Sequence, residues 1–241
     1  MYLILKNISC LVTCKGIEGK TKENMKDAGI INNGYIVIEK DTIIDIGNKD
    51  GYIQYIKDDS VVIDCSGKTV TPGLIDCHTH VVYSGSRENE LQLKLQNKSY
   101  IDILNSGGGI LSTVRSTRKS SKEVLVNESK NRLDNMLLHG TTTVESKSGY
   151  GLNLEDEVKI LEVNKILDNI HPIDIISTYL GAHAIPEEYK NNRQGYIEEI
   201  KNTHIPYIVE NNLAEFIDCF CEEGVFTADE TKEILEVGNK A

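Results

Sequence analysis

An alternation of apolar strand segments with helical segments, from Thr69 to the C-terminus, constrains the fold of this chain more than any other feature. The apolar segments cover residues 69–83, 141–146, 173–180 and 214–221. Helical segments cover residues 121–138, 154–167 and 196–209, and a last one starts at residue 228. Four strand-then-helix units predict a parallel α/β domain, because parallel strands need long, usually helical, connections.

The length of this region predicts a partial TIM-like barrel. Residues 69–241 are too few for a complete eight-unit barrel, which takes about 250 residues, and four units make half of one. An open four-stranded sheet is the alternative, but its first strand would normally lead into a G-x-G-x-x-G loop, and the sequence has none. We therefore expect a chain truncated at its C-terminal end.

The N-terminal region has a different pattern. Residues 1–68 contain short apolar segments with period two, such as Ile36 and Ile38, which is typical of strands. We expect a small β-sandwich-like domain over residues 1–68, followed by the first half of the barrel over residues 69–241.

Charge and hydropathy exclude several classes of protein. The 26 Lys and Arg against 37 Asp and Glu give a net charge of −11, which argues against nucleic acid or anionic membranes as partners. No uncharged apolar run approaches the roughly 18 residues of a membrane span. Lys6 interrupts the N-terminal apolar run too early for a signal peptide, so we expect a cytoplasmic protein.

The cysteines form no C-x-x-C pair, and we expect them to be reduced and mostly buried. Cys219 and Cys221 share one face of the last strand and could bind a metal, but core thiols are the favoured interpretation. The six cysteines are Cys10, Cys14, Cys65, Cys77, Cys219 and Cys221.

Two histidines close the first strand of the α/β region. His78 and His80 lie two positions apart, so a strand would direct both imidazoles to one face. Active sites of parallel barrels lie at the C-terminal ends of the strands, and imidazole nitrogen suits zinc or iron. A satisfied polar pair is the alternative for an isolated H-x-H.

The segment PGLIDCHTH over residues 72–80 resembles the first barrel strand of the amidohydrolase superfamily. Five further motifs narrow the resemblance to the imidazolonepropionase family. They cover residues 86–90, 107–110, 139–152, 181–189 and 219–227. The resemblance implies metal-dependent hydrolysis of the small molecule 4-imidazolone-5-propanoate to N-formimidoyl-L-glutamate in histidine degradation, with His78 and His80 binding one zinc or iron ion.

Three residues match the family's substrate contacts. The guanidinium group of Arg87 is suited to bind the substrate propionate. Tyr150 lies in a Ser-Gly-Tyr-Gly loop, and its phenol can both stack and hydrogen-bond. His183 could hydrogen-bond the substrate ring or its tetrahedral intermediate. The alternatives are a surface arginine, a tyrosine packed on the barrel rim and a core histidine.

Other polar residues carry less weight as candidates. Glu145 and Lys147 follow the second strand and could line the site, but charged residues at strand ends are commonly solvated or paired. His139, His171 and His204 have local structural interpretations close to a Gly or a Pro, and we assign them no role.

Metal-assisted hydrolysis needs at least three protein ligands and a base. The resemblance places a further metal histidine, the acidic general base and a metal aspartate beyond Ala241, so no catalytic base is assigned. Two alternatives stay open, a non-catalytic fragment that needs a complementary chain and a sister amidohydrolase acting on another cyclic amide. Open strand edges predict association, with a homodimer as one option.

Overall fold

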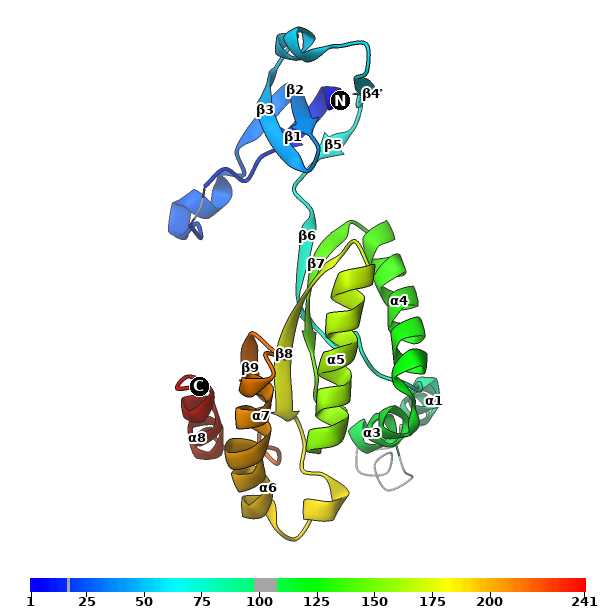
Figure 1. The fold of residues 1–241 in the computed structure, drawn as a ribbon, viewed down its shortest axis with the longest axis vertical. Coiled ribbons are helices and arrows are strands. Elements are labelled where there is room, and N and C mark those ends of the chain that lie inside the picture. The colour runs from blue at the N-terminus through cyan, green and yellow to red at the C-terminus, as the bar shows by residue number, and fades with distance from the viewer. Residues whose placement is uncertain (17, 98–107) are drawn as a thin grey trace. The chain divides into compact units, whose positions relative to one another are not determined.

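A computed structural model describes residues 1–16, 18–97 and 108–241. The chain divides into two compact units, Met1–Gly73 and Leu74–Ala241 (Figure 1). The boundary that we expected after Lys68 lies at Gly73, because Thr69–Val70 forms strand β5 and pairs with the first strand of the chain.

The first unit is built on one mixed sheet. Its strands are β1 (Tyr2–Val12), β2 (Ile30–Glu39), β3 (Thr42–Asn48), β4 (Val61–Asp64) and β5, and its two short 3-10 helices are η1 (Lys22–Lys26) and η2 (Gly51–Tyr55). Strands β1, β2 and β3 are antiparallel neighbours, whereas β4 and β5 run parallel to β1. The expected sandwich is not confirmed, because the described strands of this unit all belong to this sheet.

The period of two in the first unit places apolar side chains on both faces of its sheet. Tyr35 and Val37 pack with Ile4 in one buried cluster, and Ile36 packs with Ile8 in another. The side chains of neighbouring β2 residues therefore pack on opposite faces of the sheet, as strand geometry requires.

The second unit is a four-stranded parallel sheet with helical connections, which confirms the predicted α/β class. Its strands are β6 (Leu74–Thr79), β7 (Thr141–Lys147), β8 (Asp174–Ala182) and β9 (Phe216–Cys219), in that order across the sheet. The helices are α1 (Glu88–Leu95), α3 (Ile110–Lys119), α4 (Lys122–Leu138), α5 (Leu154–Ile170), α6 (Arg193–Glu199), α7 (Ile205–Glu210) and α8 (Ala228–Gly238).

Helices α4 and α5 lie side by side and cover the middle of this sheet (Figure 1). Leu125 and Leu133 of α4 and Ile160 of α5 form a buried cluster with Val144 of β7. A second cluster unites Tyr179 of β8 with residues of α6, α7 and α8. Strands β6 and β9 are the two edges of the sheet, as predicted for half a barrel.

Helix boundaries agree with the sequence where a capping residue is present. Ser121, Asn153 and Thr227 each accept a hydrogen bond from the backbone of the helix that they precede. The expected helix over residues 196–209 is divided into α6 and α7 by a π-helical turn, η4 (Ile200–His204), and Pro206 stands in the first turn of α7, where proline is tolerated.

The prediction that the cysteines are mostly buried is wrong, although all six are free thiols. Cys65 and Cys219 are buried, but Cys77 is exposed because it lies on the edge strand β6. Cys221 is exposed as well, because it follows the end of β9, so it is not the core thiol that we expected. Helices α1 and α3 were not predicted.

Candidate active site

The two histidines of the H-x-H motif lie at the C-terminal end of β6, where a barrel would carry its site. His78 is exposed on the edge strand, whereas His80 follows the strand and is mostly enclosed. Among the described residues, the Nδ1 atom of His80 is the buried side-chain polar atom without a hydrogen-bond partner. Such an unpaired nitrogen is costly in a folded chain unless another group binds it.

The surroundings of His80 keep its imidazole neutral. Burial, followed by the electrostatic effect of the neighbouring His183 imidazole, lowers the pKa of His80 to about 3. A neutral imidazole with a buried, unpartnered nitrogen fits a zinc or iron ligand. In the described part of the chain, no three or more His, Cys, Asp or Glu side chains gather as a complete metal site, so His78 and His80 are two candidate ligands of a larger set.

Aromatic contacts join His80 to two of the predicted substrate residues. Its ring stacks on His183 with centroids 4.8 Å apart and planes at 11°, and the Tyr150 ring lies 4.7 Å away. Tyr150 and His183 are themselves 5.4 Å apart. These three residues come from β6, β7 and β8 or the loops directly after them, so the parallel topology brings them together.

A cavity of about 740 Å³ opens beside these rings. Arg87, Tyr150 and His183 all line it, so the structure brings together the three residues predicted to contact the substrate. Arg87 is exposed and immediately precedes α1. The remaining lining residues are Glu90, Leu91, Gly109, Ile110, Leu111, Ala184, Ile185, Phe220, Glu223, Gly224 and Val225.

Hydrogen bonding and burial determine the protonation states of His183 and Tyr150. His183 Nδ1 lies 2.9 Å from the Gly149 carbonyl oxygen, which can only accept, so this nitrogen carries the proton and Nε2 is left as an acceptor in the neutral ring. Burial lowers the pKa of His183, against the opposing effect of that hydrogen bond. Burial raises the pKa of the Tyr150 phenol, which therefore stays a hydrogen-bond donor at neutral pH.

The loop that carries Tyr150 is held by a residue that sequence reasoning missed. The Glu157 carboxylate is fully buried and accepts hydrogen bonds from the backbone N–H groups of Gly149, Gly151 and Leu152. An acidic residue in the first turn of a helix is common, so the sequence gives no signal for this contact.

Glu145 and Lys147 form a charged cluster with Asp218 across the strand ends. Lys147 Nζ lies 2.7 Å from Glu145 Oε1 and 2.9 Å from Asp218 Oδ2. Burial would lower the pKa of Lys147, but these hydrogen bonds hold it above its ordinary value. Thr178 also donates to Glu145. The two residues are therefore paired, and Asp218 could have been identified as the acidic residue within an apolar strand.

The remaining histidines have local partners. His139 contacts the Asn135 carbonyl, His171 lies 3.3 Å from Asp134, and His204 Nδ1 lies 2.7 Å from the Tyr179 hydroxyl. Residue 107 of the motif at 107–110 lies outside the described residues.

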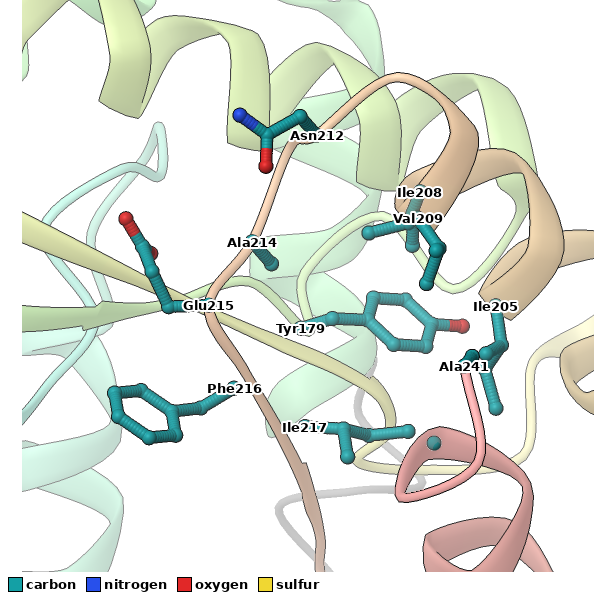
Figure 2. Close-up of a pocket in the computed structure, with 11 residues that line it drawn as sticks. Tyr179, Ile205, Ile208, Val209, Asn212, Ala214, Glu215, Phe216, Ile217 and Ala241 are labelled. Atoms are coloured by element: carbon teal, nitrogen blue, oxygen red, sulfur yellow. The ribbon is translucent and has the colours of Figure 1, made fainter.

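A smaller hollow of about 230 Å³ lies among α7, β9 and the end of α8. Figure 2 shows the Tyr179 ring with Ile205, Ile208, Val209 and Ile217 around it. None of the predicted site residues lines this hollow, whose walls are mostly apolar apart from Tyr179, Asn212 and Glu215.

The chain is similar along nearly its whole length to curated imidazolonepropionases. It is 50% identical over 238 residues to that of Fusobacterium nucleatum and 51% identical over 241 residues to that of Geobacillus thermodenitrificans. These matches take in 99% and 98% of the chain, and the chain spans 57% of the length of each relative. The resemblance drawn from the sequence motifs is confirmed.

Several solved structures with a similar fold are named as hydrolases. A triazine hydrolase from Arthrobacter aurescens has a TM-score of 0.61 at 12% identity, covering 97% of this chain and 49% of its own. A mutant atrazine chlorohydrolase from the same species, complexed with zinc and atraton, has a TM-score of 0.58 at 12% identity, covering 99% and 50%. These similarities support the predicted fold, and the chain covers about half of each of these two structures.

Two further comparisons were negative. No protein-family model matches the chain. In the part of the chain that the structure describes, no helix is both long and apolar enough to cross a membrane.

Proposed function

We propose that this chain carries the substrate-binding half of an imidazolonepropionase, which hydrolyses a ring C–N bond of 4-imidazolone-5-propanoate to give N-formimidoyl-L-glutamate. The observation that supports this proposal most is the single cavity lined by Arg87, Tyr150 and His183, with the His80 ring stacked on His183 and 4.7 Å from the Tyr150 ring. The sequence identity of about 50% to curated imidazolonepropionases supports the proposal independently.

The three lining residues suit a small planar anion. The Arg87 guanidinium binds the propionate, on a chain whose net charge would otherwise repel it. The Tyr150 ring stacks on the imidazolone and its hydroxyl donates to the substrate or to the opened product. His183 accepts a hydrogen bond at Nε2 from the ring N–H, because its Nδ1 proton is engaged by Gly149.

We assign His78 and His80 as ligands of one zinc or iron ion. When bound, the ion would supply a Lewis acid and an activated water. The chain's own contribution is to keep the His80 ring neutral and enclosed, with its Nδ1 atom unpaired. The chain spans 57% of the relatives' length, so we place the remaining ligands and the general base in the part of the relatives that it does not match.

The wider setting is part of the same proposal. We propose a role in histidine degradation, a cytoplasmic location and a small-molecule substrate, with neither nucleic acid nor membrane as partner. The net charge of −11 supports the absence of polyanionic partners. We also propose that the first unit is part of a β-sandwich-like domain.

Two alternative functions follow from the same residues. A non-catalytic fragment would keep the cavity but need a complementary chain for turnover, which the open edges at β6 and β9 favour. A sister amidohydrolase would keep His78 and His80 but open another cyclic amide.

One experiment separates these functions. The purified 241-residue chain is loaded with zinc or iron(II), and metal content, binding of 4-imidazolone-5-propanoate and loss of its absorbance are measured. Turnover with about one metal per chain supports the complete activity, and binding without turnover supports the fragment. If the chain binds no substrate while His80→Asn lowers metal content relative to His139→Asn, the substrate assignment is wrong and a sister activity is favoured.

A further inference from the structure

Glu157 is unusual because it is fully buried and, among the described residues, forms no ion pair with a cationic side chain. Its carboxylate lies 2.9 Å from the backbone nitrogen of Gly149, 2.7 Å from that of Gly151 and 2.8 Å from that of Leu152. A buried carboxylate is costly unless several donors compensate for lost water, and here all of them belong to one loop.

The same loop holds both cavity rings that come from β7 and β8. Tyr150 lies between two of the N–H groups that Glu157 binds, and its ring lines the cavity. The Gly149 peptide has two partners, because its N–H donates to Glu157 and its carbonyl accepts from His183 Nδ1. One carboxylate therefore determines the position of the atoms that support both rings.

The backbone conformation of this loop explains why the loop needs the hydrogen bonds to Glu157. Gly149 has a φ of +101°, and a Cβ atom there would lie 2.8 Å from both His183 Nδ1 and the Leu180 carbonyl oxygen. Leu152 has a φ of +56°, which a non-glycine residue adopts at a cost. Without the Glu157 carboxylate, three buried N–H groups and this backbone conformation would lose their compensation.

Arg118 does not replace this function. Its Nε donates to the Gly151 carbonyl oxygen, and its charge pairs with Asp156 and Glu188. Arg118 thus holds one carbonyl, whereas Glu157 holds the N–H groups on both sides of Tyr150.

We infer that Glu157 is a positioning residue of the substrate cavity, which fixes the Nδ1–H tautomer of His183 through the Gly149 peptide and the place of the Tyr150 ring through the loop. The consequence for binding rests on the proposed function, but the tautomer and the ring contact do not. A glutamate that served only the stability of the fold would leave both unchanged in any variant that still folds.

The test uses the complete chain with its histidine rings labelled with ¹⁵N and a chelator present. His183→Asn assigns the His183 signals. We expect the wild-type ring to show a protonated, exchange-protected Nδ1 and an unprotonated Nε2, and a nuclear Overhauser contact between Tyr150 and His80. In Glu157→Gln we expect a mixture of the two His183 tautomers and loss of that contact, because one acceptor becomes a donor facing the loop N–H groups.

Two control variants separate positioning from stability and charge. Glu155→Gln removes an exposed charge from the same helical turn and should change nothing. Asn164→Ala removes a buried side chain that bonds Ser146 further along α5, so it destabilises the fold while leaving the His183 tautomer unchanged. If Glu157→Gln folds with the wild-type tautomer and ring contact, or if Asn164→Ala disturbs them equally, the positioning role is refuted.

A binding measurement connects this result to the proposed function. We expect Glu157→Gln to weaken binding of 4-imidazolone-5-propanoate about tenfold or more, and Asn164→Ala to leave binding within about twofold at a temperature where it is folded. If the wild-type chain binds no substrate, the proposed function fails while the tautomer measurement still decides the role of Glu157. If the tautomer changes and binding does not, Glu157 positions His183 without serving this substrate.

Discussion

At the scale of single residues, the candidate site separates what a motif can predict from what it cannot. Arg87, Tyr150 and His183 were predicted by motif, and the fold brings them to one cavity. Glu157 was missed, because its role depends on contacts across the loop. Asp218 was missed although it stands as an acidic residue within an apolar strand, and its partner Lys147 lies across the sheet. A motif predicts which residue types meet a ligand, whereas the residues that hold them become visible only in three dimensions.

Arg87 provides the first prediction at this scale. Arg87→Ala should weaken binding of 4-imidazolone-5-propanoate about tenfold or more, because a charge-assisted contact to the propionate is lost. Isothermal titration measures the change, with Lys119→Ala as control, since Lys119 is also exposed but does not line the cavity. Equal affinity of the Arg87 variant and the wild type would remove Arg87 from the carboxylate site.

Lys147 provides the second. Its side chain is 5% exposed and forms ion pairs with both Glu145 and Asp218. Lys147→Met should lower the free energy of unfolding by about 3 kcal/mol, because two carboxylates are left facing an apolar side chain. Urea denaturation measures this loss. Lys130→Met, which removes an exposed pair with Asp134, should cost less than about 0.5 kcal/mol, and similar losses in both variants would contradict the buried-pair argument.

At the scale of elements, capping chemistry made the helices predictable. Thr227 and Glu230 stand at capping-box spacing at the start of α8, and both hydrogen bonds of the box are present. Helices α1 and α3 were missed, because α1 follows a Gly/Ser segment and α3 begins after Gly109, which provides no side-chain cap. The π-turn between α6 and α7 has no signal of its own in the sequence.

Glu230 makes the stability of α8 dependent on pH. Its hydrogen bonds from Arg193, partly opposed by burial, lower the pKa of Glu230 from 4.5 to about 2. Because the folded-state pKa is depressed, this stability is complete above about pH 4.5 and is lost as the pH falls toward 2. Glu230→Gln should therefore cost about 1–2 kcal/mol at pH 7 and much less at pH 2.

Chemical denaturation across this pH range measures the difference. Glu236→Gln is the matched control on the same helix, because its contact with Lys232 is long and exposed. A constant difference between wild type and Glu230→Gln at all pH values would show that the Arg193 contact does not determine the pKa of Glu230.

At the scale of the whole chain, the order of the strands was predictable and the exposure of their edges followed from it. Each unit of the α/β region pairs with the next, so β6 and β9 become edges. The N-terminal unit was harder to predict, because the period of two in β2 gives the faces of a sheet but not whether a second sheet covers either one. Whether a second sheet covers a face depends on contacts between residues that are far apart in the sequence.

The two edges predict self-association of the 241-residue chain. Ile75 on β6 is 70% exposed and Phe216 on β9 is 61% exposed, and an edge strand also presents unpaired backbone groups. We expect concentration-dependent association in sedimentation velocity, and Ile75→Lys and Phe216→Lys should each raise the dissociation constant about tenfold, or about 1.4 kcal/mol. Ile166→Lys places the same charge on an exposed residue of α5 and should have no effect, because α5 packs on the internal strand β8. A monomer at all concentrations, or equal effects of the three variants, would mean that the edges do not mediate association.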